Sequence, residues 1–347
     1  MKEAMCYTKQ EGGDVQCYLC RRMCRIKPGE TGYCHVRENR DGTLYTLPYG
    51  KAVAVNVDPV EKKPFYHFMP GADCFSFSTV GCNFRCKYCQ NWEISQAYSG
   101  IVGEDWPPEK IVEYSSSNNI SGIAYTYTEP TIFMEYALDT AKLAHQKDIF
   151  NVFVTNGYES DAAISEMAGR IDASRIDLKG FNEKIYRDVC GDVELEGVLA
   201  TIKGLYKIGH IEIINLVVPG YNDDEDDLRA VSKWCAELDP NVPLHFIGFY
   251  PANKMEDVPS TKLDTLLKAR EIAMDEGVKF AYSGNRMDEK SESTYCPKCG
   301  EMVVCRRGFG VVENKVDGYN KCPECGEELY FVNDINEYWR KNGKRND

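Results

Sequence analysis

The chain has 347 residues, of which 43% are hydrophobic and 27% charged, values ordinary for a globular protein that buries a sizeable core. Its net charge of −13 argues against a general nucleic-acid binder, which normally presents a basic face. The sequence shows no signal-peptide pattern and no apolar run of about twenty residues. We therefore expect a cytoplasmic protein without a membrane span.

Sixteen cysteines are more than an ordinary cytosolic protein carries. Without a secretion signal they indicate metal ligands rather than disulfides, and most of them fall into three groups. These groups predict three domains: an N-terminal four-cysteine module (1–72), a core (73–287) and a C-terminal zinc ribbon (288–347).

The N-terminal module contains four cysteines at C-x2-C-x3-C-x9-C spacing. The four are Cys17, Cys20, Cys24 and Cys34. Glycine and proline turn the chain between them, so the pattern predicts a metal site. Zinc and an auxiliary iron–sulfur cluster both take four thiolates, and spacing does not decide between them. Zinc is our first choice, and a second iron–sulfur cluster is the alternative.

From residue 73 the chain alternates short apolar strands with amphipathic helices. We expect strands at 74–80, 122–127, 149–154, 175–178, 211–218, 244–249 and 278–282. We expect helices to begin near Pro107, Thr131, Ser160, Asn182, Leu195, Asp223 and Ser260. This alternation predicts an α/β fold with parallel strands, whose ligands gather at the carboxyl ends of the strands.

Three cysteines at C-x3-C-x2-C spacing follow the first strand of this core. Cys82, Cys86 and Cys89 leave no fourth cysteine or histidine within the next forty residues, whereas structural zinc wants four ligands. In a four-iron cluster, three thiolates leave one iron open to another ligand. The spacing, with Tyr88 before the last cysteine, resembles the signature of the radical S-adenosylmethionine (SAM) enzymes. A metal knuckle with a distant fourth ligand is the alternative.

Polar residues follow the next strands. The segment Thr126–Pro130 looks like this family's glycine-glycine-glutamate loop, which implies that Thr128 and Glu129 hold the SAM amine; a helix cap is the alternative for Glu129. Asn156 is a candidate ligand contact within a plain turn signal. Asp177 and Lys179 share one face of a strand, where Lys179 can pair with the SAM carboxylate. A structural ion pair is the alternative.

Two further features have structural interpretations. His67 and His245 are expected to be packing residues, and the acidic run Asp223–Asp227 opens a helix, where its charges compensate the helix dipole.

The tail contains two C-P-x-C-G knuckles. Their cysteines, Cys296, Cys299, Cys322 and Cys325, predict a zinc ribbon. The same ligand set holds a single iron in rubredoxin-type sites, which is the alternative.

Taken together, residues 15–285 resemble the radical SAM member of the AmmeMemoRadiSam system, which is similar to pyruvate formate-lyase activating enzymes. The resemblance implies a partial (β/α)6 barrel, a [4Fe–4S] cluster on Cys82, Cys86 and Cys89, and hydrogen abstraction by a 5′-deoxyadenosyl radical. It also implies a low-potential donor of flavodoxin or ferredoxin type and an anaerobic setting. The C-terminal ribbon departs from the family pattern and puts a simple transfer of partner in doubt.

The substrate does not follow from the resemblance. A protein partner, as for glycyl-radical activases, is the first candidate, and a small molecule, cofactor or RNA base is the second. A zinc-dominated binding module without radical chemistry is the alternative from another class.

Overall fold

The structure is a computed structural model that describes residues 1–96, 99–316 and 318–343. The chain forms two compact units, each assembled from separate stretches. The first unit comprises Met1–Asp58, Asp73–Ser174 and Glu196–Gly209. The second comprises Pro59–Ala72, Arg175–Leu195 and His210–Asp347. The three domains expected from the sequence remain a prediction.

Three parallel strands form the centre of the first unit. They are β9 (Asp73–Ser78), β11 (Gly122–Tyr125) and β12 (Phe150–Thr155). β11 lies in the middle, with Gly122 opposite Cys74 on one side and Phe150 on the other. A Cβ at Gly122 would lie 2.1 Å from the Phe150 ring, so this position requires glycine. The strands are buried on both faces, as parallel strands covered by helices must be.

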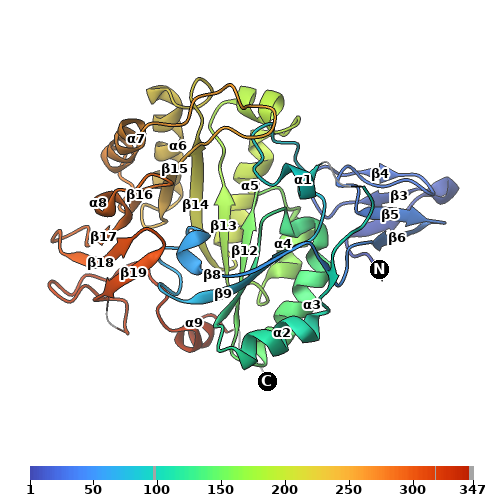
Figure 1. Cartoon of the computed structure of the whole chain (residues 1–347), viewed down its shortest axis with the longest axis horizontal. Helices are drawn as coiled ribbons and strands as arrows, with labels where there is room; N and C mark the ends of the chain where they lie inside the picture. The colour runs from blue at the N-terminus through green and yellow to red at the C-terminus, as the bar shows by residue number, and fades with distance from the viewer. Residues whose placement is uncertain (97–98, 317, 344–347) are drawn as a thin grey trace. The chain divides into compact units, whose positions relative to one another are not determined.

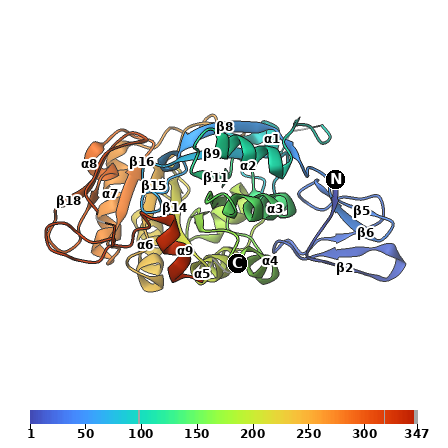
Figure 2. The ribbon, with the colours of Figure 1, turned by 90° about the horizontal axis from the view of Figure 1, so that it is seen from below.

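Helices follow these strands in the expected order. The set is α1 (Trp92–Ser95), α2 (Pro108–Ser117), α3 (Met134–His145), α4 (Asp161–Met167) and α5 (Leu195–Tyr206). α2 and α3 pack against each other, and α3 also packs on β11 and β12 (Figures 1 and 2). α2 begins at Pro108, next to the expected Pro107, and the hydroxyl of the expected Ser160 caps α4.

Two small antiparallel sheets make up the N-terminal part of this unit, visible as separate blue ribbons in Figure 2. One sheet contains β1 (Lys2–Glu3), β6 (Thr43–Thr46) and β5 (Arg37–Arg40). The other contains β2 (Tyr7–Lys9), β3 (Val15–Cys17) and β4 (Arg25–Ile26). A short 3-10 turn at Glu11–Gly13 joins β2 to β3. β7 (Lys51–Ala52) pairs with β10 (Glu104–Asp105), and β8 (Ala54–Pro59) leads toward the core.

The second unit also contains parallel strands. They are β14 (His210–Val217), β15 (Leu244–Gly248) and β16 (Ala281–Gly284), with β15 between the others. The helices α6 (Glu225–Leu238) and α7 (Leu263–Asp275) pack together, and α7 covers β15 and β16 (Figure 1). This unit also contains residues 175–177 of strand β13 (Ala173–Asp177), the turns η2 (Val60–Lys62) and η4 (Ile185–Val189), and α8 (Glu289–Glu292).

The tail is a three-stranded antiparallel sheet followed by one helix. Its elements are β17 (Thr294–Tyr295), β18 (Met302–Arg307), β19 (Gly310–Asn314) and α9 (Ile335–Lys341). A hydrophobic cluster that includes Phe280, Val303, Leu329 and Phe331 joins it to the rest of the second unit. This shared core argues that the tail folds on the unit rather than as a loose appendage.

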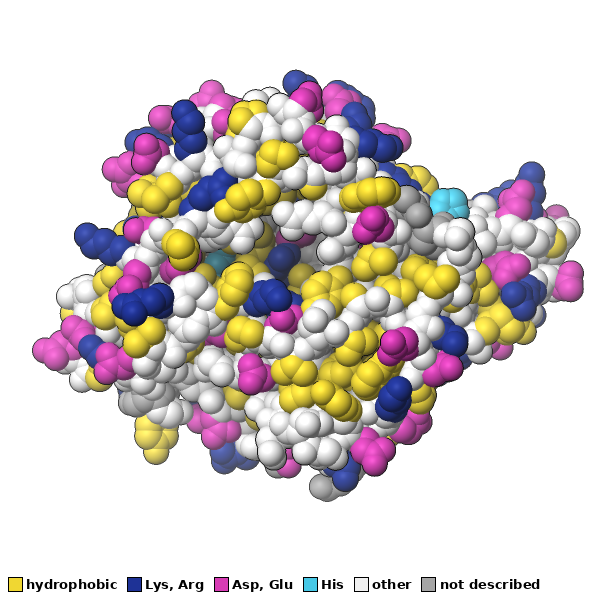
Figure 3. All heavy atoms as spheres, viewed as in Figure 1, with side chains coloured by type: hydrophobic (Ala, Val, Ile, Leu, Met, Phe, Trp, Pro, Cys, Tyr) yellow, Lys and Arg dark blue, Asp and Glu magenta, His cyan; other side chains and the backbone are white. Residues whose placement is uncertain are grey.

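The predicted fold class is confirmed: the chain is α/β with parallel strands, and the described strands do not close into a full barrel. No described helix is long and apolar enough to cross a membrane. On the face shown in Figure 3, acidic and basic side chains are interspersed.

Candidate functional site

The three-cysteine loop begins where β9 ends and closes on α1. Gly81 has φ 98°, a left-handed conformation that glycine adopts at no steric cost. Its N–H donates to Ile94 in α1, so the loop returns to its own start. The Phe84 N–H donates to Cys82 Sγ at 3.3 Å, and Cys89 Sγ lies 3.3 Å from Ser95 Oγ. All three cysteine residues are partly exposed.

Asn83 connects this loop to the end of β12. The side chain is fully buried, and its Oδ1 accepts a hydrogen bond of 2.7 Å from Asn156 Nδ2. The same Asn156 nitrogen lies 3.9 Å from Cys82 Sγ. The predicted ligand contact Asn156 therefore lies beside the first cysteine of the loop. Its Oδ1 is buried and has no hydrogen-bond partner among the described residues, so it is available to a bound group.

The segment after β11 lies against the same loop. Tyr127 adopts φ 64°, an uncommon value for a non-glycine residue that marks constrained backbone. Its carbonyl accepts from Asn91 at 2.7 Å, and its hydroxyl donates to Asp58 at 2.7 Å. The Thr128 hydroxyl donates to the Thr79 carbonyl at 2.9 Å. These bonds fix the position of residues 126–129 relative to the cysteines.

Glu129 is buried, and its carboxylate is held by several donors. Oε1 accepts from the N–H and the hydroxyl of Thr131 at 3.0 and 2.5 Å and from the Thr155 hydroxyl at 2.9 Å. Oε2 accepts from the Asn156 N–H at 2.8 Å. This carboxylate therefore caps the turn η3 (Pro130–Phe133), as the alternative interpretation anticipated, and also ties β11 to β12. Its contact with a ligand amine remains a prediction.

A second buried carboxylate adjoins Glu129. Glu159 is fully buried, and its Oε1 lies 2.7 Å from the Thr155 hydroxyl, which also contacts Glu129. Burial raises the pKa of both carboxyls, and the charge of Glu159 raises that of Glu129 further. Burial also raises the pKa of the Cys82 thiol, and the Glu129 charge adds to that effect. A cation bound beside Cys82 would reverse this balance and favour the charged forms.

Asp177 and Lys179 belong to the second unit. Lys179 Nζ donates to Asp177 at 2.9 Å, and Arg175 pairs with the same carboxylate. Burial alone would raise the pKa of Asp177, but the charges of Arg175 and Lys179 hold it below its usual range. The pair forms as the period-two pattern indicated. Its contact with SAM remains a prediction.

The N-terminal cysteines line one small cavity in the first unit. Cys17, Cys20, Cys24 and Cys34 share this lining with Arg37 and Asn83, among others. Burial raises the pKa of Cys20 and Cys24, and raises that of Cys34 to about 11.

The tail cysteines form the tightest ligand group. The sulfurs of Cys296, Cys299, Cys322 and Cys325 all lie within 4.8 Å of one another. Two pairs are separated by 3.6 and 3.7 Å, as expected for four thiolates about 2.3 Å from one tetrahedral ion. The four-cysteine group is therefore present, and its geometry suits a single metal ion.

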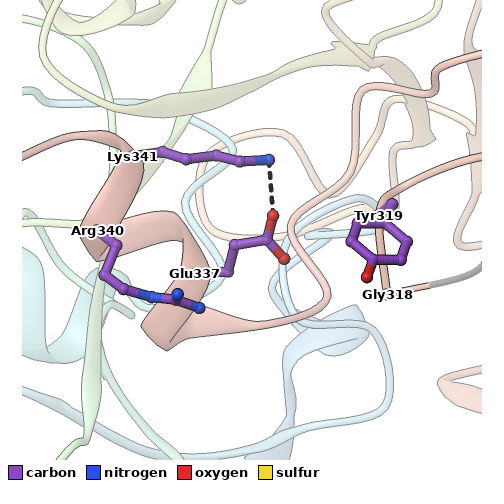
Figure 4. Close-up of a pocket in the computed structure, with 5 residues that line it drawn as sticks. All are labelled: Gly318, Tyr319, Glu337, Arg340 and Lys341. Carbon is purple, nitrogen blue, oxygen red and sulfur yellow. Dashed lines mark ion pairs between the residues drawn. The ribbon is translucent and has the colours of Figure 1, made fainter.

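A separate surface pocket lies in the tail (Figure 4). Gly318, Tyr319, Glu337, Arg340 and Lys341 line it, and Lys341 pairs with Glu337 at 2.8 Å. The cysteine groups and the predicted SAM contacts are not among its lining residues.

The histidines in the second unit are structural. His67 is buried, stacks on Phe331 at 4.0 Å and bonds to the Tyr330 carbonyl and the Tyr282 hydroxyl. His245 donates to the buried carboxylate of Glu212 at 2.7 Å. In the acidic run, Asp224 caps α6. All three observations agree with the expected packing and capping roles.

Several residues around the cysteine loop carry no motif of their own. Asn83, Asn91, Tyr127 and Thr155 were missed because each has a partner that lies far away in sequence. Glu159 was missed because it joins this group only through Thr155. The only available signal was position: each lies in or directly after a predicted strand end or the cysteine loop.

Taken together, a parallel α/β unit with a three-thiol loop at the end of its first core strand defines a class of iron–sulfur enzyme. Comparison of the sequence with known proteins agrees with this class. The Radical SAM superfamily pattern matches residues 76–231. An uncharacterized protein from Methanocaldococcus jannaschii is 43% identical over 96% of this chain and 100% of its own length. The chain belongs to the radical SAM superfamily.

Activating enzymes appear among the other relatives. The pyruvate formate-lyase 1-activating enzyme of Escherichia coli is 27% identical over 58% of this chain and 89% of its own. A solved domain of a pyruvate-formate lyase-activating enzyme from Bacteroides vulgatus aligns with TM-score 0.41 and 19% identity, covering 48% of this chain and 99% of the domain.

Proposed function

We propose that the first unit binds a [4Fe–4S] cluster through Cys82, Cys86 and Cys89, that SAM binds at the open iron, and that the enzyme abstracts hydrogen from a substrate. The observation that carries the proposal is the partly exposed three-thiol loop, tied to the end of β12 by the Asn83–Asn156 bond of 2.7 Å. Three thiolates suit a cubane with one open iron and do not complete a zinc site.

The residues present fit these groups. Backbone N–H groups and hydroxyls near cluster sulfurs tune such centres, and Phe84 and Ser95 supply them to Cys82 and Cys89. The unpartnered Oδ1 of Asn156 offers an acceptor beside Cys82. The bound cluster and SAM together supply one-electron cleavage of the sulfonium and a 5′-deoxyadenosyl radical.

The chain's own residues have positioning roles. Glu129 holds the Asn156 N–H and Thr155, and thus sets where the Asn156 side chain lies relative to Cys82. Asn91 and Thr128 anchor the segment after β11 to the cysteine loop. Lys179, which forms an ion pair with Asp177, is the proposed partner of the SAM carboxylate.

The first test is anaerobic reconstitution with iron and sulfide, reduction, and addition of SAM. We expect 5′-deoxyadenosine from the wild type and none from a Cys82, Cys86 and Cys89→Ala variant. Cys305→Ala is the matched control, because this cysteine is also partly exposed but lies outside the three groups. Product formed equally by the triple variant would refute the proposal.

The proposed substrate class is a protein, in the manner of the activating enzymes that the chain resembles. A partner protein deuterated at glycine should transfer deuterium into 5′-deoxyadenosine and acquire an organic radical signal. Transfer from a small molecule or RNA, with none from proteins, would assign the second candidate class instead.

A further inference from the structure

Arg286 follows strand β16 of the second unit, and its guanidinium is held in place by neutral groups. Its Nε donates to the Thr261 carbonyl at 2.8 Å, and its Nη1 donates to the Asn285 carbonyl at 3.2 Å. The guanidinium lies 4.0 Å from the centre of the Tyr250 ring. Within the part of the chain that the structure describes, it forms no ion pair with a carboxylate. The positive charge is thus positioned but not neutralised.

One carbonyl orients both the ring and the cation. The Asn285 carbonyl, which binds Arg286, also accepts from the Tyr250 hydroxyl at 2.8 Å. Asn285 adopts φ 59°, a left-handed conformation that asparagine tolerates better than most residues, and its side chain donates to the Gly248 carbonyl at 3.3 Å. Tyr250 and Arg286 follow the neighbouring strands β15 and β16, so their side chains are set against each other before any ligand binds.

This group lies at the same end of the second unit as the predicted SAM contact Lys179. The Thr261 hydroxyl donates to the carbonyl of Val217, the last residue of β14. The Asn222 side chain donates to the carbonyl of Leu216, one residue earlier, and to the Lys179 carbonyl at 2.7 Å. In parallel α/β folds, ligands gather at the carboxyl ends of the strands. The guanidinium therefore lies at the ligand-binding end of its unit.

The remaining donors of the guanidinium suit an anionic group. Arginine has five N–H donors in a fixed fork, and the two carbonyls occupy one on Nε and one on Nη1. The others match the two oxygens of a carboxylate or phosphate. Because the carbonyls and the Tyr250 ring already hold the Arg286 side chain, little side-chain entropy is lost when an anion binds.

The surroundings favour a single carboxylate over a polyanion. Two acids, Asp288 and Glu289, follow Arg286 closely in the chain. Asp288 caps α8 by accepting from the Ser291 N–H at 2.9 Å, and Glu289 pairs with Arg307 at 3.1 Å, so both are engaged elsewhere. Their charges still disfavour a nucleic acid, whose binding depends on several cations that contact phosphates.

Exposed apolar side chains accompany the guanidinium. Met287 is 93% exposed and Tyr250 is 43% exposed. Arginine, tyrosine and methionine are enriched at the centres of protein interfaces, and arginine and tyrosine are frequent binding hot spots. The three side chains together fit a peptide that carries an acidic residue.

We propose that Arg286, Tyr250 and Met287 form a docking surface for the protein substrate, in which Arg286 recognises an Asp or Glu side chain. The proposal rests on the proposed function, because it states how that substrate is chosen. The guanidinium–carboxylate pair selects substrates with an acidic residue on the segment that docks. It takes no part in hydrogen transfer.

The experiment measures peptide binding to the full chain without a reductant, so the result does not depend on radical chemistry. The probes are short fluorescein-labelled peptides with a central glycine, in which one Glu is moved through the flanking positions. Each is compared with its Gln counterpart by fluorescence polarisation. At one position or more, Glu should bind about fivefold tighter than Gln, the upper range for a partly exposed ion pair. Equal binding at every position, or no binding by any peptide, would overturn the proposal.

Variants assign the preference to the guanidinium. Arg286→Met should abolish the preference for Glu, and Arg286→Glu should invert it in favour of peptides with Lys at the same position. The matched control is Arg229→Met, which removes the same charge from a guanidinium that already pairs with Glu276 at 2.6 Å and should keep the preference. If Arg286→Met does not fold, Arg286→Lys gives an independent reading: it keeps the charge but loses the fork, and should weaken the preference. A full preference for Glu in any of the Arg286 variants would refute the assignment.

Two further ligands test other sources of the anion. SAM and an oligouridylate RNA are each titrated into the wild type and Arg286→Met, and equal affinities are expected. A loss of SAM affinity in Arg286→Met would reassign the guanidinium to the SAM carboxylate, and a loss of RNA affinity would reassign it to phosphate; either would overturn the proposal. Absence of SAM cleavage in a protein that keeps the preference for Glu would instead refute the proposed radical reaction and leave the docking surface in place.

Discussion

The ion pair between Arg37 and Glu135 offers the sharpest test of how the N-terminal segment is held. Arg37 Nη1 donates to both Glu135 oxygens at 2.8 and 3.0 Å, and both side chains are at most 3% exposed. Glu135 Oε1 also accepts from the Met5 N–H at 2.7 Å, and Arg37 donates to the Met5 carbonyl at 2.6 Å. The pair thus links β5 and the chain start to α3.

Glu135→Ala leaves the Arg37 charge buried without its partner. Breaking a buried pair in this way costs about 3–5 kcal/mol. Since about 1.4 kcal/mol is a factor of ten, local opening of residues 1–46 should increase on the order of 100-fold or more. Hydrogen exchange followed by mass spectrometry on the metal-free protein measures this opening peptide by peptide.

The matched control is Glu166→Ala, which removes an exposed i,i+4 pair with Arg170. Both of its side chains are about 45% exposed, so we expect a loss of at most ~0.5 kcal/mol. Replacing both buried partners, Arg37→Met with Glu135→Leu, should restore most of the protection. Equal exchange in Glu135→Ala and Glu166→Ala would refute the reasoning.

Three further outcomes are expected. Asn156→Ala removes the bond to Asn83 and should lower 5′-deoxyadenosine formation ~100-fold at unchanged iron content, because small misplacements carry costs of this size; an unchanged rate would remove Asn156 from the site. Cys299→Ser with Cys322→Ser should release about one zinc per chain and loosen the tail, as read by metal analysis and limited proteolysis, whereas iron lost in its place would assign a rubredoxin-type centre. Burial lowers the pKa of His67 to about 3, so its contribution to stability is complete above an unfolded pKa of about 6.5 and is lost as the pH falls toward 3. Unfolding at pH 5 should therefore cost about 2 kcal/mol less than at pH 7, and a His67→Phe variant should show a smaller change; equal slopes would contradict this.

The pattern of strands was predictable because apolar strands and capped helices repeat along the chain. The errors lie at the ends of the strands, where local backbone contacts decide which residue is the first or last. The last strand was expected at 278–282 but begins at Ala281, because the Val278 N–H still closes α7 through Ala273. The second core strand ends at Tyr125 because Tyr127 turns into the left-handed region.

The first residues of helices were also predicted less well than the presence of the helices. The helix expected near Asn182 is a π turn from Ile185, whose N–H the Asn182 side chain caps. The helix expected near Thr131 begins with a 3-10 turn, and α3 starts only at Met134.

The cysteine groups could be found from spacing alone, but their surroundings could not. The contact of Asn83 with Asn156 joins positions 73 residues apart, and that of Arg37 with Glu135 joins positions 98 apart. Sequence spacing also gives no sulfur separations, so it does not decide between zinc and an iron–sulfur cluster at the N-terminal cysteines.

The central claim is that a cluster on Cys82, Cys86 and Cys89 delivers one electron to SAM. The most direct measurement is a single turnover in which the photoreduced protein is mixed with SAM, and the loss of the reduced-cluster EPR signal is compared with the 5′-deoxyadenosine formed. The account predicts about one product molecule for each reduced loop cluster in the wild type, and none when those three cysteines are alanine. A reduced loop cluster that persists beside bound SAM and substrate without product, or product that survives loss of the three cysteines, would contradict it.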